Sequence, residues 1–121
     1  MQDGTFHFTH YELIAFHVAQ ELADLVMVIA PQVPEGHAKM VDQIVRAATG
    51  AEALVAEGAN RYTPKQKRQR FVEARGEAGE VAAHLERLRR YRFISEAQLH
   101  QGLGLADRLC ALLTGLIRRH S

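Results

Sequence analysis

The chain has 121 residues, of which 47% are apolar and 24% are charged, a composition typical of one soluble globular domain. Its single cysteine, Cys110, excludes an internal disulfide, and no apolar run reaches the roughly 20 residues that a bilayer span needs. We therefore expect one domain over residues 1–121, located in the cytoplasm and without a membrane segment.

The two halves of the chain carry opposite charge. Residues 1–60 hold two basic and eight acidic side chains, whereas residues 61–121 hold thirteen basic and six acidic ones. This asymmetry indicates either a polyanionic partner or acidic and basic helices that face each other within or between subunits. The near-neutral total of +1 favours the second interpretation.

The first predicted helix spans about residues 9–30. Thr9 is the expected N-cap, Glu12 closes a capping box three residues later, and Phe8 packs onto Leu13. Five apolar residues then recur at helical spacing: Ile14, Val18, Leu22, Leu25 and Ile29. Pro31 and Pro34 end the pattern.

The second predicted helix spans about residues 38–57. Its apolar residues recur at intervals of three and four, which predicts one buried face: Met40, Val41, Ile44, Ala48, Ala51 and Val55. Gly58 follows directly, and glycine is the commonest residue just past a helix end. We therefore place the C-terminus of this helix before Gly58.

Two further capping boxes open the remaining helices. Thr63 precedes Pro64 and lies three residues before Gln66, and Ser95 lies three residues before Gln98. These signals predict helices over about residues 64–90 and 96–119. Because every connection is short and strand signals are lacking, the sequence predicts an all-α, antiparallel up-down-up-down four-helix bundle.

The last two helices carry more apolar surface than one bundle core requires. On residues 96–119 the predicted core stripe is Leu99, Leu103, Ala106, Cys110, Leu113 and Ile117, and a second stripe is Leu105, Leu109, Leu112 and Leu116. On residues 64–90 the core stripe is Phe71, Ala78, Val81, Leu85 and Leu88, and the opposite side carries Val72, Gly76, Gly79 and Ala83. Two unlike surplus stripes favour a ring-shaped homo-oligomer, with both stripes at the interface.

Residues 43–86 also resemble a known family. The matching positions are Gln43, Arg46 and Ala47, then Ala56, Glu57 and Gly58 followed by Arg61, then Gly76 and Glu80. They resemble the bacterial four helix bundle protein family, first noticed as reading frames inside intervening sequences of large ribosomal RNA genes. A distant relative is the accessory variability protein of diversity-generating retroelements. The resemblance implies an antiparallel bundle assembled into a ring of five, no established reaction, and nucleic-acid binding by the retroelement relatives.

Clustered cations after residue 60 provide an independent signal for nucleic acid. Phosphate contacts need several cations on one surface. The candidates are Arg61, Lys65, Arg68, Arg87 and Arg90, four of which fall on the outer side of the helix over residues 64–90. A charge run is more often a solvated helix face, so this surface is the second hypothesis rather than the first.

Two polar groups invite an active-site interpretation. Gln43, Arg46, Glu57 and Glu80 suit a hydrogen-bond network that fixes the helix register better than a catalytic centre. The chain departs from the family at three positions where members carry Ser, Asn and Ser: Gly50, Leu54 and Glu77. The i, i+4 pairs Glu80/His84 and Glu96/His100 support a metal-dependent enzyme only weakly, because di-iron bundles space these ligands i, i+3.

Three functional hypotheses follow. The first is a non-enzymatic homo-oligomer, pentameric as the family resemblance implies, that serves as an adaptor or scaffold and requires no cofactor or metal. The second is an RNA- or DNA-binding ring that uses the basic surface. The third, ranked last, is a metal-dependent bundle enzyme. Partners are therefore other copies of the chain and either nucleic acid or a protein.

Overall fold

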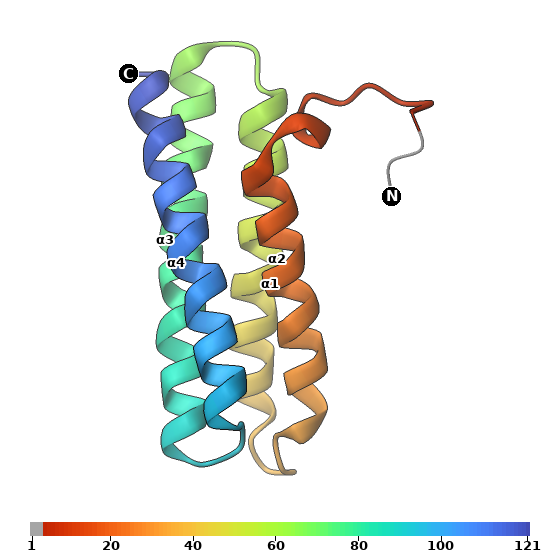
Figure 1. Cartoon of the computed structure of the whole chain (residues 1–121), viewed down its shortest axis with the longest axis vertical. Helices are drawn as coiled ribbons and strands as arrows, with labels where there is room; N and C mark the ends of the chain where they lie inside the picture. Colours follow the sequence, from red (N-terminus) through yellow and green to blue (C-terminus); the bar gives the residue numbers. More distant parts are fainter. Residues whose placement is uncertain (1–3) are drawn as a thin grey trace.

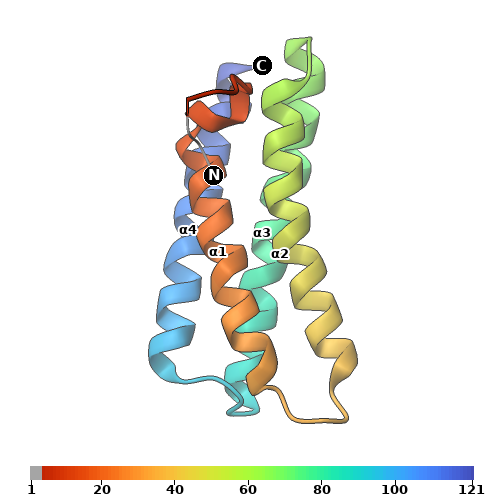
Figure 2. The same cartoon turned by 90° about the vertical axis from the view of Figure 1, so that its right-hand side faces the viewer.

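The computed structural model describes residues 4–121, and its described part is helical with no strands. The elements are η1 (Thr9–Glu12), α1 (Ile14–Ile29), η2 (Ala30–Gln32), α2 (Ala38–Asn60), α3 (Pro64–Arg90) and α4 (Glu96–Arg119). The four long helices run up and down along one axis and are joined by short loops (Figures 1 and 2). The all-α four-helix prediction is confirmed.

Both capping boxes predicted in the second half are present. The Thr63 hydroxyl accepts a hydrogen bond from the Gln66 backbone N–H at 3.2 Å, and the Gln66 side chain accepts from the Thr63 N–H at 3.4 Å. Ser95 and Gln98 form the same pair of bonds, at 3.1 and 3.0 Å. Helices α3 and α4 begin where these local signals place them.

The predicted start of the first helix is wrong. Helix α1 begins at Ile14, and Thr9–Glu12 forms a separate 3-10 turn in which Thr9 caps no helix. The Asn60 side chain at the end of α2 explains this turn, since its Oδ1 accepts from the Thr9 N–H and its Nδ2 lies 2.7 Å from His10 Nδ1. A tertiary contact therefore replaces the capping box.

The predicted end of the second helix is also wrong. Helix α2 continues through Gly58 to Asn60, and Gly58 is buried inside it. A Cβ at Gly58 would lie 2.6 Å from Cε1 of Phe71, which is closer than real Cβ atoms approach a ring. Glycine occurs here because α3 approaches α2 closely, and not because the helix ends.

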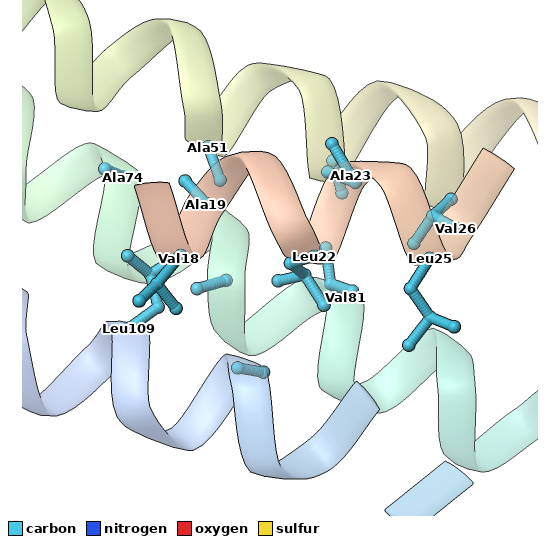
Figure 3. Close-up of a cluster of buried hydrophobic side chains, with 14 of the residues drawn as sticks. Val18, Ala19, Leu22, Ala23, Leu25, Val26, Ala51, Ala74, Val81 and Leu109 are labelled. Atoms are coloured by element: carbon cyan, nitrogen blue, oxygen red, sulfur yellow. The ribbon is translucent and has the colours of Figure 1, made fainter. Parts of the chain in front are cut away.

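The core runs the length of the bundle between all four helices. Its largest buried side chains come from every helix: Leu22, Ile29, Ile44, Phe71, Leu85, Leu88, Leu109 and Leu113. Figure 3 shows part of this cluster, where α1 faces the other helices. The predicted core of α1 is correct except at Ile14, which is 58% exposed because Ala15 and Phe16 take the inward positions of the first turn.

One segment, Ile14–Gln32, is long and apolar enough to cross a membrane by length and composition. Half of its apolar window is buried inside the bundle. Burial against α2 and α4 accounts for the inward half of that apolar character, whereas Ile14, Met27 and Val28 are exposed.

Segments far apart in sequence meet at each end of the bundle. One end gathers Thr9–Glu12, the loop over residues 61–63 and the C-terminus of α4 (Figure 1). The opposite end carries the loops over residues 33–37 and 91–95 (Figure 2). We call the first the α2–α3 end and the second the α3–α4 end.

Candidate functional site

The outward face of α3 carries a stripe of small residues that its own chain leaves uncovered. Val72, Gly76, Gly79 and Ala83 are all exposed, with Val72 at 41%. A Cβ built on Gly76 or Gly79 would meet nothing within 4 Å. Neither glycine is therefore required by packing within the subunit, in contrast to Gly58. We call these four residues the small-residue stripe.

The second stripe predicted on α4 is only partly surface. Leu109 is fully buried and Leu116 is buried, whereas Leu105 and Leu112 are half-buried. Figure 3 places Leu109 in the same cluster as Val18 of α1. The core side of α4 lies between the two predicted stripes, because α4 packs on both α1 and α3. The assignment of Leu109 and Leu116 to an oligomer interface is therefore wrong.

Two hollows flank α4. The hollow between α1 and α4 measures about 540 Å³ and is lined partly by Leu13, Ile14 and Leu112. The hollow between α3 and α4 measures about 390 Å³ and includes Gly79 and Cys110. The Cys110 thiol lies 3.8 Å from the Arg75 carbonyl oxygen, and burial raises its pKa, so it is protonated near neutral pH. Cys110 is thus a half-buried packing residue.

Opposite corners of the bundle carry opposite charge. Helices α1 and α3 each pack on α2 and α4, so they occupy diagonal corners. Helix α1 exposes Glu21 and Asp24 and contains no Lys or Arg. Helix α3 exposes four of the predicted cations: Lys65, Arg68, Arg87 and Arg90. These four and the four residues of the small-residue stripe all project from the same half of the helix.

These cations form two groups and not one surface. Lys65 and Arg87 are separated by roughly 33 Å of helix at 1.5 Å per residue. Lys65 and Arg68 lie at the α2–α3 end, and Arg87 and Arg90 lie at the α3–α4 end. A single ligand could therefore contact the cations at one end only, unless it were long enough to span the whole small-residue stripe.

Three cations at the α2–α3 end already have partners within the subunit. Arg61 pairs with Glu57 at 3.7 Å, Arg70 pairs with Glu73 at 2.6 Å, and the Lys67 ammonium donates to the Ala59 carbonyl. Hydrogen bonds from Gln69 and then Arg70 hold the pKa of Glu73 below its usual value. The predicted cation Arg61 is therefore partly neutralised by its neighbour.

Among the described residues, Lys65 and Arg68 on α3 have no such partner at that end, and neither do Arg118 and Arg119 at the C-terminus of α4. Lys65 and Arg68 are exposed, and neither pairs with a carboxylate anywhere in residues 4–121. They line a hollow of about 600 Å³ together with Thr63, Pro64, His120 and Ser121. Burial lowers the pKa of His120, and nearby Lys67 and Arg119 lower it further. This hollow thus concentrates positive charge that the chain does not neutralise.

At the α3–α4 end, Arg87 and Arg89 are both engaged with neighbouring side chains. The Arg87 guanidinium lies over the Tyr91 ring at 5.7 Å, and Arg89 bonds to Glu96 and to the Ile94 carbonyl. His37 and Phe93 also contact the Tyr91 ring or each other. Arg90 is exposed and has no carboxylate partner in the described chain.

The 23S rRNA-intervening sequence protein family matches residues 11–115, which is nearly the whole bundle. The chain belongs to this family. No curated protein matches it significantly. A crystal structure from Bacteroides thetaiotaomicron, of a protein of unknown function from the S23 ribosomal protein family, has the same fold at a TM-score of 0.77, with 21% identity, covering 86% of this chain and 98% of that one.

The hydrogen-bond network inferred from the family motif does not form within this subunit. Gln43, Arg46 and Glu57 are exposed, and no hydrogen bond among residues 4–121 joins any of them to Glu80. One carboxylate oxygen of Glu80 is buried without a hydrogen-bond partner. Glu57 instead pairs with Arg61, one turn farther along the chain.

A second orphaned oxygen lies on the same α2–α3 seam. Oε2 of Glu77 is buried without a hydrogen-bond partner and lies 3.5 Å from where a Cβ of Gly50 would be. Neither Gly50 nor Glu77 carries a hydroxyl group that could donate a hydrogen bond across this seam.

The metal interpretation finds no geometric support in the described residues. Within residues 4–121, no three His, Cys, Asp or Glu side chains lie close enough together to hold a metal ion. Glu96 bonds to Arg89, and neither Glu80 nor Glu96 forms a recorded contact with His84 or His100. The predicted i, i+4 pairs are therefore not assembled into one site.

Proposed function

We propose that this chain is a non-enzymatic scaffold that self-associates into a ring-shaped homo-oligomer, pentameric as the family resemblance implies. The observation that carries this proposal is the small-residue stripe on α3. Each interior helical glycine costs about 1 kcal/mol relative to alanine. Gly76 and Gly79 have no compensating contact within their own subunit. Close approach of a neighbouring helix supplies that compensation.

Charge complementarity supports the α1 side of a second copy as the neighbouring surface. That side exposes Glu21 and Asp24 and the apolar side chain of Ile14, beside the hollow that Leu112 lines. The α3 side supplies cations at both ends of an uncharged stripe. Joining two unlike faces is a heterologous contact, which closes into a ring when the rotation allows. Burial of the apolar residues contributes about 25 cal/mol per Å².

Light scattering after size-exclusion chromatography tests the assembly. The wild-type chain is expected to elute at a multiple of its 13.5 kDa mass at micromolar concentration. Gly76→Leu with Gly79→Leu should reduce that mass while the helical circular dichroism signal is retained. Gly104→Leu is the matched control, because Gly104 is exposed on α4 and also meets nothing within 4 Å. A monomeric wild-type chain would refute the proposal.

The exposed charges provide an independent test of the interface. Reversing Glu21 and Asp24 to lysine should dissociate the ring, because it removes the negative charge of the proposed α1 face. Reversal of two exposed acidic residues elsewhere, Glu35 and Asp42, serves as the control. If both acidic pairs have the same effect, net charge rather than a specific contact controls the assembly.

A second candidate function is nucleic-acid binding by the hollow at the α2–α3 end. Lys65 and Arg68 support it, because they remain unpaired beside cations that are paired. A ring would bring several copies of this end together, and avidity would strengthen a weak individual contact. We expect binding that is steeply salt-dependent and indifferent to sequence. We place both functions in the cytoplasm.

Reversal of the two cation groups separately tests this second function. Lys65→Glu with Arg68→Glu should abolish binding of a labelled oligonucleotide in fluorescence anisotropy. Arg87→Glu with Arg90→Glu, at the other end of the same helix, should leave most of it. The two double variants change net charge equally, so a general electrostatic effect would weaken binding equally. That equal loss would exclude the α2–α3 end as the site.

A further inference from the structure

Tyr62 is the most exposed large hydrophobic residue in the described part of the molecule. Its side chain is 95% accessible, and it occupies the middle of the loop over residues 61–63. Its ring contacts no other ring in residues 4–121, and no hydrogen bond to its hydroxyl is formed there. A large aromatic side chain in water gains none of the stabilisation that burial would provide. The fold itself therefore gives no reason for tyrosine at this position.

The loop places Tyr62 between the end of α2 and the start of α3, three residues before Lys65. Arg61 on one side pairs with Glu57 and ends α2, and Thr63 on the other side caps α3. Lys65, the second residue of α3, borders both the hollow it shares with Arg68 and a second hollow of about 290 Å³. The two chain neighbours of Tyr62 thus each line one of these hollows, Thr63 the larger and Arg61 the smaller.

Tyr91 at the α3–α4 end provides a comparison within the same chain, because its ring packs against other side chains. Its ring is only 52% exposed, lies under the Arg87 guanidinium, and contacts His37 and Phe93. The ring faces of Tyr91 are thus engaged, whereas those of Tyr62 are free. The difference points to a ligand that supplies a flat partner for Tyr62.

We propose that the α2–α3 end binds single-stranded nucleic acid, with the Tyr62 ring stacked on an unpaired base and Lys65 and Arg68 contacting adjacent phosphates. This inference rests on the second proposed function and specifies its ligand. Single strands expose base faces to stacking, whereas a duplex hides them. Aromatic rings interleaved with cations are the usual composition of surfaces that bind single strands without sequence preference.

Fluorescence anisotropy with labelled oligo-dT, oligo-U and a hairpin duplex tests the proposal on the full chain. Tyr62→Ala should weaken binding of both single strands at least about fivefold, the lower range for loss of one stacked base. Tyr62→Phe should retain binding, because it preserves the ring. Tyr91→Ala is the matched control and should bind like the wild type. Equal affinity for hairpin and single strands, or an unchanged affinity in Tyr62→Ala, would overturn the stacking inference.

The sequence lacks tryptophan, which permits a direct readout of stacking. In Tyr62→Trp the new indole is the sole tryptophan, and its emission should be quenched on addition of oligo-dT but not of heparin, which has phosphate-like charge and no bases. Tyr91→Trp should show no quenching. Quenching by poly-glutamate as strong as that by oligo-dT would assign this end to an acidic protein instead.

Failure of the inference and failure of the function it rests on can be told apart. If the wild-type chain binds neither single strands nor hairpin at low salt, the nucleic-acid function itself is wrong. If it binds both, and loses both in Lys65→Glu with Arg68→Glu but neither in Tyr62→Ala, the function holds and the stacking role of Tyr62 is wrong.

Discussion

Helix α3 uses glycine contacts in opposite ways on two of its sides. On the side that faces α2, Gly58 admits the Phe71 ring so closely that even a methyl group would collide with it. On the outward side, Gly76 and Gly79 admit nothing from their own chain. The first contact is complete within the subunit, and the second becomes complete only when another chain arrives. Glycine thus permits a close packing contact within the subunit at Gly58, whereas at Gly76 and Gly79 the subunit supplies no contacting atom.

The largest effect is expected where the contact is complete. Gly58→Ala should lower the free energy of unfolding by about 1–3 kcal/mol, because overpacking a well-packed core displaces Phe71. Urea denaturation monitored by circular dichroism measures it. In a Phe71→Leu background, whose side chain is smaller, the same substitution should cost less. If the two substitutions were simply additive, the close approach would not be the cause.

Substitution of Gly76 or Gly79 should change the free energy of unfolding in the opposite direction. Gly76→Ala or Gly79→Ala should stabilise the isolated bundle by up to about 1 kcal/mol, since alanine is the better helix former and no atom lies in its way. The dissociation constant of the oligomer should rise in the same variants if the stripe is a close interface. Gly50→Ala, whose Cβ would lie at ordinary contact distance from Glu77, is the control that stabilises without affecting assembly. Destabilisation by Gly76→Ala in a chain that stays monomeric would contradict this comparison.

The smallest effect concerns the end of the α2–α3 seam, where Asn60 holds the N-terminal turn. Asn60 Nδ2 also donates to the Ala56 carbonyl, and its Oδ1 accepts from Thr9, so the amide is fixed with its NH₂ toward His10 Nδ1. His10 must therefore be neutral there. Burial, and then the nearby His17, lower the pKa of His10.

The sign of the pH effect follows from that lowered pKa. The stabilisation is fully present above pH 6.5, the ordinary pKa of histidine. As the pH falls below 6.5, the unfolded chain binds a proton at His10 before the folded chain does. The stabilisation is therefore lost between pH 6.5 and the lower pKa of His10 in the folded state. Its size is bounded by one hydrogen bond, about 0.5–1.5 kcal/mol. Melting temperatures across this range should fall less in His10→Phe than in the wild type. Equal falls in both chains would assign the pH dependence to other groups, such as His120.

Local signals determined the second half of this protein. The capping boxes at Thr63 and Ser95 need only residues within one turn, so the starts of α3 and α4 could be placed from the sequence. The apolar repeat from Phe71 to Leu88 likewise gave the inward face of α3, and the opposite stripe is exposed as its spacing implies. Of the candidate site, the unpaired state of Lys65 and Arg68 was not predictable, because it depends on which carboxylates lie nearby in space.

Tertiary contacts decided the rest, and each error has that origin. Asn60 is about 50 positions from Thr9 and His10, yet its amide converts an expected helix start into a separate turn. Gly58 resembles a helix stop by type, but the approach of Phe71 makes it an interior residue. Leu109 and Leu116 were placed on the surface by periodicity alone, whereas α4 packs on two helices and therefore buries a wider face. The sequence by itself determined the four helices and their order, because capping and periodicity act over a few residues, and only the tertiary structure decided which glycines are filled, which leucines are covered and which cations remain free.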